Sequence, residues 1–191
     1  ICKAINRLRD ELSSQLYGVT PLEPANEVKH RNLLALGYDW REENIRGGNI
    51  LEREALREIL DPSHPFVIVN TDSLPGAEDE RTPSGSVRNI IEARAAADIA
   101  IAAYESYLSR EGSLKPVIIT PYSAQVGEVL RAFEERGALS SFSDDHVITA
   151  YKSQGREYPF VIVSLVRRNP YRSIGFLEDQ ILRAQVYVAC S

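Results

Sequence analysis

A cluster of polar residues, Gln154 to Glu157, stands shortly before an apolar run at Phe160 to Val166. A turn that merely enters a buried strand is satisfied by Asn, Asp, Ser or Gly in almost any order. The segment Gln-Gly-Arg-Glu offers more, because it combines an amide, a glycine, a cation and a carboxylate. Such a set can donate hydrogen bonds to an anion and accept them from hydroxyl groups. Taken alone, the cluster fits either a turn with a pair of surface charges or a ligand-binding loop.

Two further polar segments also follow apolar runs. Residues 120–125, Thr-Pro-Tyr-Ser-Ala-Gln, continue the run that begins at Val117, and residues 166–169 read Val-Arg-Arg-Asn. Ligands of parallel sheets gather at the carboxyl ends of the strands. If these runs are neighbouring parallel strands, the polar segments meet at one edge.

Several familiar kinds of catalytic site are missing from the sequence. There is no G-x-x-x-x-G-K-[ST], and no G-x-G-x-x-G follows a strand, so the chain lacks a phosphate cradle of its own. There is no G-x-S-x-G and no H-E-x-x-H. The histidines, His30, His64 and His146, lie in separate segments beside turns. Nucleophilic and metallohydrolase readings have no support, and we expect no metal site.

The elements that would position the polar segments alternate along the chain. Strands are expected at 66–70, 117–121, 147–151, 160–166 and 185–189, where short runs are β-branched and apolar nearly throughout. A helix is expected from Asn89 to a closing Gly112, and another over 123–136 with Gly137 after it. This order predicts an α/β fold with a mainly parallel sheet and helices on both faces.

The first 64 residues differ in pattern from the rest. They contain an amphipathic helix candidate at 4–16 and a shorter one at 50–60, with Asn49 as its N-cap. We expect a mostly helical segment over 1–64 and a separate domain over 65–191. Residues 71–87 are polar and rich in Pro, Gly and Ser, which indicates a long surface loop.

Composition narrows the class of protein. With 43% hydrophobic and 26% charged residues the chain reads as globular, and no apolar run is long enough to span a membrane. No secretory signal is recognisable, so an intracellular location is expected. The net charge of -5 argues against a wholly basic coat for nucleic acid but leaves room for a local basic groove. The chain begins at Ile and has no Met, so we expect a piece of a longer protein.

The spaced blocks resemble a known family. Residues 117–125, residues 147–158 with the following strand, and residues 174–179 are similar to motifs IV, V and the approach to VI of superfamily 1 helicases. The likeness is closest to the branch with the nonsense-mediated-decay and replication-associated helicases. The resemblance covers about residues 66–191 and implies the second RecA-like domain of such an enzyme, a three-layer fold.

The resemblance also implies roles for individual residues. Glu157 would lie toward the ribose of ATP, with Gly155 beside it. Gln154, Arg167 and Arg183 would take catalytic positions near the phosphates. The residues expected to lie along single-stranded DNA or RNA are Thr120, Pro121, Tyr122, Gln125 and Thr149.

Departures from the family pattern matter as much as the matches. The motif VI segment stops at Ser191, where a phosphate-stabilising Arg would come next, so the domain is expected to be truncated within that motif. Walker A, Walker B and Mg²⁺ would belong to a preceding RecA-like half, the expected partner of this domain. Tyr151 and Lys152 resemble the H-K-S-Q-G of other superfamily 1 enzymes.

Two other functions remain open at this point. One is a helicase-like module that binds nucleic acid or protein and never meets an active P-loop lobe. The other is an unrelated α/β enzyme of flavodoxin-like architecture, with a small ligand at the same strand ends. The sequence does not distinguish DNA from RNA or name the direction of movement.

Overall fold

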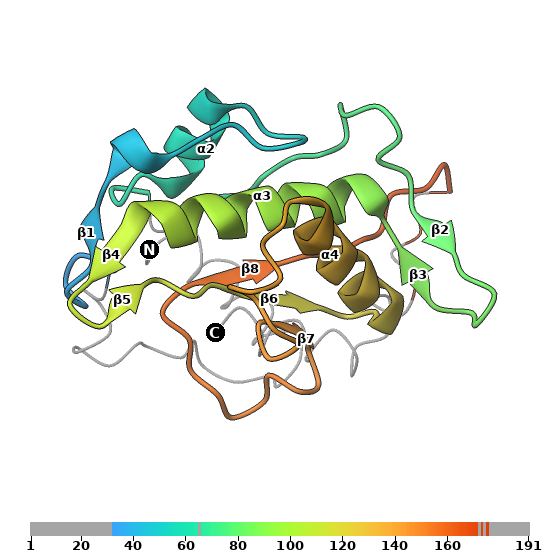
Figure 1. The fold of residues 1–191 in the computed structure, drawn as a ribbon. Coiled ribbons are helices and arrows are strands. Elements are labelled where there is room, and N and C mark those ends of the chain that lie inside the picture. The colour runs from blue at the N-terminus through green and yellow to red at the C-terminus, as the bar shows by residue number, and fades with distance from the viewer. Residues whose placement is uncertain (1–31, 65, 172, 174, 176–191) are drawn as a thin grey trace, which may run out of the picture.

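The computed structural model describes residues 32–64, 66–171, 173 and 175. Figure 1 shows two long helices lying across a small central sheet. In chain order the elements are β1 (Asp39–Trp40), η1 (Glu42–Asn44), α2 (Arg53–Leu60), β2 (Glu80–Arg81), β3 (Val87–Arg88), α3 (Ile90–Ser106), β4 (Tyr107–Ser109), β5 (Gly112–Ser113), β6 (Val117–Thr120), α4 (Ser123–Glu135), β7 (Val147–Thr149) and β8 (Val161–Val163). No helix within these ranges is both long and apolar enough to cross a bilayer.

The central sheet is parallel, as the sequence predicts. Its strand order is β7-β6-β8, with Ile118 opposite Val147 on one side and opposite Ile162 on the other. All four residues of β6 are buried, which suits a middle strand covered on both faces. The parallel sheet with its packed helices confirms the predicted α/β, RecA-like class.

Two of the predicted strands differ from the structure. Phe66 to Asn70 is apolar but forms no strand, and Ile68 is 79% exposed, so hydrophobicity there does not reflect a place in the sheet. The run 160–166 is a strand only over β8, because the chain turns away at Val166, whose φ is 74°. Residues 185–189 and 4–16 lie outside the described residues.

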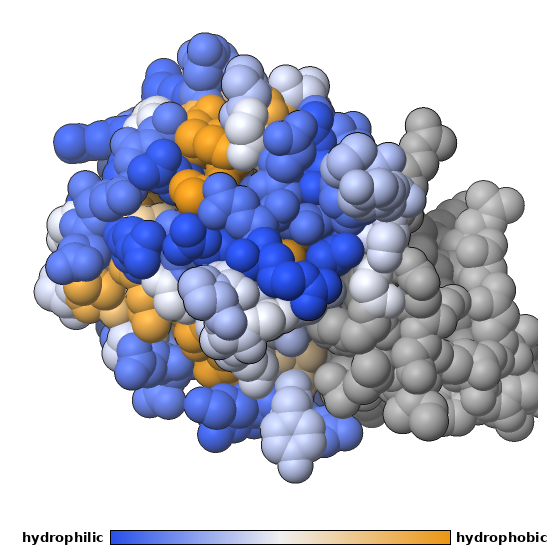
Figure 2. Space-filling model, turned by 90° about the vertical axis from the view of Figure 1, so that its right-hand side faces the viewer, coloured by the Kyte–Doolittle hydropathy of each residue, from blue (hydrophilic) through white to orange (hydrophobic). Residues whose placement is uncertain are grey.

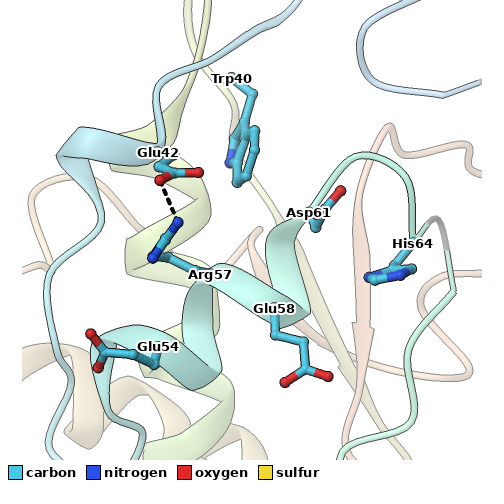
Figure 3. A pocket seen from close by; sticks show the side chains of 7 residues that line it. All are labelled: Trp40, Glu42, Glu54, Arg57, Glu58, Asp61 and His64. Carbon is cyan, nitrogen blue, oxygen red and sulfur yellow. Dashed lines mark hydrogen bonds and ion pairs between the residues drawn. The ribbon is translucent and has the colours of Figure 1, made fainter.

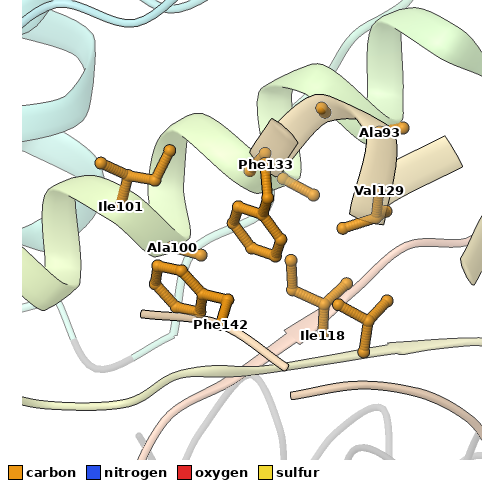
Figure 4. Close-up of a cluster of buried hydrophobic side chains, with 11 residues drawn as sticks. Ala93, Ala100, Ile101, Ile118, Val129, Phe133 and Phe142 are labelled. Carbon is orange, nitrogen blue, oxygen red and sulfur yellow. The ribbon is translucent and has the colours of Figure 1, made fainter. Parts of the chain in front are cut away.

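Helices α3 and α4 pack on the same face of the sheet. Small side chains on α3, including Ala93 and Ala100, let α4 approach closely, and Phe133 of α4 fills the space between them (Figure 4). The ring of Phe133 stacks on Phe142 with centroids 4.3 Å apart. On the other face, the buried side chains of β6 and β7 meet Tyr158 from the loop before β8. Helices were predicted for both faces; within the described ranges they cover one.

The end of α3 also departs from the prediction. The helix stops at Ser106 rather than running on to Gly112. Tyr107 then pairs with Trp40 in an antiparallel sheet of order β1-β4-β5. Its buried ring donates a hydrogen bond from the hydroxyl to the carbonyl of Leu60 at 2.6 Å, and burial raises the pKa of Tyr107 to about 12. Tertiary pairing therefore overrides the helical pattern of this stretch. Helix α4 ends before Gly137, as predicted.

The loop at 71–87 is more ordered than predicted, because it contains the β2–β3 hairpin. Helix α2 is present, but its N-cap is Glu52 and not Asn49. The backbone N–H groups of Asn49, Ile50 and Leu51 instead donate to the carboxylate of Asp98, which lies buried on α3. This carboxylate fastens the N-terminal part to α3. The proposed division at residues 64 and 65 stays a prediction.

Gly48 allows this contact, since a Cβ built on it would lie 2.0 Å from the carboxylate carbon of Asp98. We expect Gly48→Ala to displace Asp98 and lower the free energy of unfolding by about 1–3 kcal/mol, the usual result of leaving buried polar groups unpaired. Gly127→Ala is the matched control, because a Cβ on this exposed α4 residue meets nothing within 4 Å. That change should raise stability by about 0.5–1 kcal/mol. Urea unfolding of both variants measures the two changes in the free energy of unfolding. Equal changes in the two variants would contradict the role of Gly48.

Candidate functional site

Two of the predicted nucleic-acid residues are neighbours at the carboxyl edge of the sheet. Thr120 ends β6 and pairs in register with Thr149, which ends β7. Thr120 is fully buried, and its hydroxyl accepts a hydrogen bond from the N–H of Tyr122 at 3.4 Å. Thr149 and Pro121 are half-buried. Of the two threonines, Thr149 is the one that is partly exposed.

The Gln-Gly-Arg-Glu cluster lies on a well-defined turn after β7. The carbonyl of Thr149 accepts hydrogen bonds from the N–H groups of Lys152 and Ser153. The buried hydroxyl of Ser153 in turn donates to the carbonyl of Ala150 at 2.8 Å. The chain therefore coils back at once after the strand and presents the following residues outward.

The cluster itself is exposed. Gln154, Gly155 and Glu157 all face solvent. Gly155 has a φ of 75°, and a Cβ there would meet nothing within 4 Å, so its freedom serves the turn and not a close approach within the chain. The arrangement leaves an amide and a carboxylate on an ordered loop at the sheet edge, where both can contact a ligand.

Gln125 has a different setting, because its side chain is completely buried. Its Oε1 accepts from the N–H of Asn89 at 2.8 Å, and its Nε2 donates to the carbonyl of Asn89 and to the hydroxyl of Ser164, both at 3.1 Å. The amide thus pairs with both backbone groups of Asn89, as a neighbouring strand would. In this arrangement Gln125 joins the starts of α3 and α4 to the end of β8.

Glu92 extends this network to the turn after β8. Its Oε1 accepts from the hydroxyl of Ser164 at 2.8 Å and from the N–H of Val166 at 2.9 Å. The side chain of Asn89 donates to the carbonyl of Val166 at 3.2 Å. Val166 is therefore held on both of its backbone groups in a left-handed conformation that branched residues rarely adopt.

Arg167 follows directly and lies nearly buried. Its Nη1 is 3.3 Å from Oδ1 of Asp79, and its Nε and Nη2 donate to the carbonyl of Ser173. Oδ2 of Asp79 accepts from the N–H of Arg168 and from the side chain of Asn169. The predicted catalytic arginine is thus ordered by the loop before the β2–β3 hairpin.

Tyr122 lies beside this arginine. Its side chain is 8% exposed, and burial raises its pKa, with the nearby Arg167 charge acting in the opposite direction. An indole or phenol platform for a base has to offer an open face. The buried setting of Tyr122 favours packing against the turn after β8 over stacking on a base.

Sequence reasoning missed Asp79 and Ser164. Ser164 carried a signal, since it is the one polar residue in the run 160–166. Asp79 stands between two other acids in a polar loop, and nothing in the sequence sets it apart. Arg183 lies outside the described residues, so its predicted role stays a prediction.

Figure 2 shows the face toward which β6 and β8 point in Figure 1. In the coloured part of this view hydrophilic side chains predominate, and apolar residues form separate patches between them.

A hollow of about 280 Å³ lies elsewhere, beside α2. Its lining is mostly acidic and comprises Trp40, Glu42, Glu54, Arg57, Glu58, Asp61 and His64 (Figure 3). Arg57 is paired with Glu42. Figure 1 places α2 toward the end of α3 that is remote from the β2–β3 hairpin, so this hollow is separate from the polar strand ends.

Comparison with known proteins identifies the class. A family model described as an AAA domain matches residues 5–188. The DNA replication ATP-dependent helicase/nuclease DNA2 of Xenopus laevis is 29% identical over 154 residues, which cover 79% of this chain and 13% of that protein. The mouse protein of the same name is 31% identical over 123 residues, or 64% of this chain and 11% of its own. Regulator of nonsense transcripts 1 of Dictyostelium discoideum is 38% identical over 64 residues, or 32% of this chain and 5% of its own.

The chain belongs to this AAA-domain family and is a domain of the superfamily 1 helicase family. The resemblance carried by the three motif blocks is thereby confirmed. The chain matches only a small part of these relatives' length, 13% of the frog protein and 11% of the mouse protein.

The buried position of Gln125 leads to a stability test. We expect Gln125→Leu, which keeps the side-chain volume, to lower the free energy of unfolding by about 1–3 kcal/mol, because the buried N–H of Asn89 loses its acceptor. Gln154→Leu is the matched control and should change stability by less than about 0.5 kcal/mol, since Gln154 is exposed. Thermal unfolding of both variants measures this. A Gln125→Leu variant as stable as the Gln154→Leu control would show that the hydrogen bonds of Gln125 do not stabilise the fold.

Proposed function

We propose that this chain is the second RecA-like domain of an ATP-dependent superfamily 1 helicase or translocase. A preceding half of the parent protein would supply Walker A, Walker B and the Mg²⁺ site. This domain would contact the ribose and phosphates of ATP and hold single-stranded DNA or RNA. Two lobes that close around ATP can move a strand that one of them grips.

One observation supports the proposal above the others. The segments that resemble motifs IV and V follow adjacent parallel strands, with Thr120 and Thr149 paired at the same edge. The exposed loop at 154–157 starts a few residues beyond Thr149. An enzyme that couples nucleotide to strand needs both contacts on one rigid edge, because a displacement at one must be felt at the other.

The exposed loop fits a nucleotide chemically. The carboxylate of Glu157 can accept hydrogen bonds from ribose hydroxyls, and the amide of Gln154 can donate to a phosphate oxygen. Arg167 provides the positive charge that developing phosphoryl charge requires. When bound, ATP supplies the free energy of phosphoryl transfer.

The strand-binding part of the proposal assigns the accessible contacts to Thr149 and Pro121. The hydroxyl of Thr149 would donate to a backbone phosphate, which fixes a strand in position without reading its sequence. Thr120, Tyr122 and Gln125 would shape the edge from within, since all three are buried.

A second function, a catalytically silent adaptor that binds nucleic acid or protein, would use the same sheet edge without hydrolysis. The full-length parent protein separates the two. Hydrolysis stimulated by single-stranded DNA or RNA and weakened by salt supports the motor, because phosphate contacts release counterions. Salt-sensitive binding without any hydrolysis would favour the adaptor.

Glu157 is the residue on which the nucleotide contact depends. We expect Glu157→Ala in the parent protein to raise the KM for ATP by about tenfold, the loss expected for one charge-assisted hydrogen bond. Steady-state ATP hydrolysis gives both constants. Glu111→Ala, an exposed change near the β4–β5 turn, is the control and should leave both unchanged. Unaltered KM and kcat in the Glu157 variant would exclude it from the site.

Thr149 gives a separate test of strand binding. Thr149→Val removes the hydroxyl and keeps the shape, so the Kd for single-stranded nucleic acid should rise about tenfold, as for one hydrogen bond to a charged phosphate. Thr149→Ser retains the hydroxyl and should bind nearly as well as the unchanged protein. Fluorescence anisotropy measures the Kd for the single strand. The affinity for nucleotide in the absence of nucleic acid should stay constant. Equal loss of both affinities would contradict the separation of the two contacts.

A further inference from the structure

We propose that Asp79 is a positioning residue that holds Arg167 for its part in ATP hydrolysis. This inference rests on the function proposed above. Asp79 precedes the β2–β3 hairpin and is separated from Arg167 by 88 positions in the chain. None of the motif blocks includes it.

The pair is not an ordinary surface salt bridge. The side chain of Asp79 is 9% exposed and that of Arg167 is 12% exposed, with Oδ1 and Nη1 3.3 Å apart. Exposed pairs contribute little because water screens them, whereas nearly buried charges depend on their partner. The neighbouring pair of Arg168 and Asp72 provides the contrast, since its aspartate is 74% exposed and its closest atoms are 3.7 Å apart.

The two oxygens of Asp79 have different tasks. Oδ2 accepts from the N–H of Arg168 at 2.8 Å and from Nδ2 of Asn169 at 3.0 Å, so it fixes the backbone of the turn. Oδ1 accepts from Arg167. The N–H of Asp79 also donates to the carbonyl of Arg168 at 2.7 Å. One carboxylate thereby sets both the course of the chain and the direction of the guanidinium.

The surroundings of Arg167 leave little freedom for another rotamer. Its Nε and Nη2 donate to the carbonyl of Ser173 at 3.3 and 3.2 Å. A Cβ on Gly175, whose φ is 64°, would lie 3.4 Å from Nε of Arg167 and 3.0 Å from the hydroxyl of Tyr122, so the packing here is close and the backbone conformation favours glycine. Asp79, Ser173 and Gly175 therefore restrict the guanidinium of Arg167, whose side chain stays 12% exposed.

Some N–H groups of the Arg167 guanidinium make no hydrogen bond within the described ranges. Contacts within the described ranges use three of its five N–H groups, one to Asp79 and two to Ser173. The remaining N–H groups, on Nη1 and Nη2, can meet a phosphate oxygen. An arginine that is oriented in advance loses less entropy when it binds and stabilises charge more effectively. Asp79 would supply that orientation through Oδ1.

Asp79→Asn separates the two tasks of the carboxylate. Its amide oxygen can take the place of Oδ2 and keep the turn, while its NH₂ group then faces the donors of Arg167 and cannot hold them. Asp72→Asn is the matched control, because it makes the same change in the same loop beside Arg168. Arg167→Gln and the double variant with Asp79→Asn complete the set.

The measurement is steady-state ATP hydrolysis by the full-length parent protein with saturating single-stranded nucleic acid. We expect Asp79→Asn to lower kcat about tenfold with little change in KM, and Asp72→Asn to leave kcat unchanged. In the Arg167→Gln background, Asp79→Asn should lower kcat no further, since Asp79 acts through Arg167. Thermal unfolding should show the Asp79 variant folded.

Three results would overturn the proposal. The first is an unchanged kcat in Asp79→Asn together with a lowered kcat in Arg167→Gln. The second is a kcat in the double variant that falls by the product of the two single losses, because the residues would then act independently. Arg167→Gln with full activity would remove both residues from the reaction. A parent protein that hydrolyses no ATP at all would instead overturn the function proposed above, which distinguishes the two failures.

Discussion

The buried amide of Gln125 is the interaction on which the edge of this domain depends. It pairs with both backbone groups of Asn89 and with the hydroxyl of Ser164, so the starts of two helices and the end of a strand share one partner. A buried polar group that loses its partner carries a large desolvation cost. A shift of α3 or α4 relative to β8 would break these hydrogen bonds and incur that cost. The hydrogen bonds therefore fix the positions of the two helices more closely than apolar packing alone.

This constraint also explains the unusual turn after β8. Val166 has a positive φ, which costs about 1–3 kcal/mol for a residue that is not glycine. Hydrogen bonds from its N–H to Glu92 and from Asn89 to its carbonyl offset the cost. Because the chain turns at this residue, Arg167 is directed away from the sheet and meets Asp79. The strain is local, but its effect is to choose where the arginine points.

The sequence predicted what short-range patterns determine. Helix α4 and the parallel strands β6 to β8 carry periodic or apolar signals, and all were found near their expected places. The predicted strand at 66–70 is wrong because an apolar run does not reveal whether a strand partner exists. The predicted extension of α3 to Gly112 is wrong because Tyr107 pairs with β1, which lies far away in the chain, and this pairing ends the helix. Asp79 could not have been found, since its role comes from a contact 88 positions away.

Burial divides residues that the motif resemblance had joined. Thr120 and Gln125 are enclosed, whereas Gln154 and Glu157 stand on an exposed turn. Of these residues, a ligand at this edge can contact only the exposed Gln154 and Glu157. The buried Thr120 and Gln125 hold the sheet edge from which the turn begins. The two groups are connected through β6 and β7, where Thr120 pairs with Thr149. Under the proposed function, the buried Thr120 and Gln125 would act on a ligand by fixing the sheet edge, whereas the exposed Gln154 and Glu157 would contact it directly.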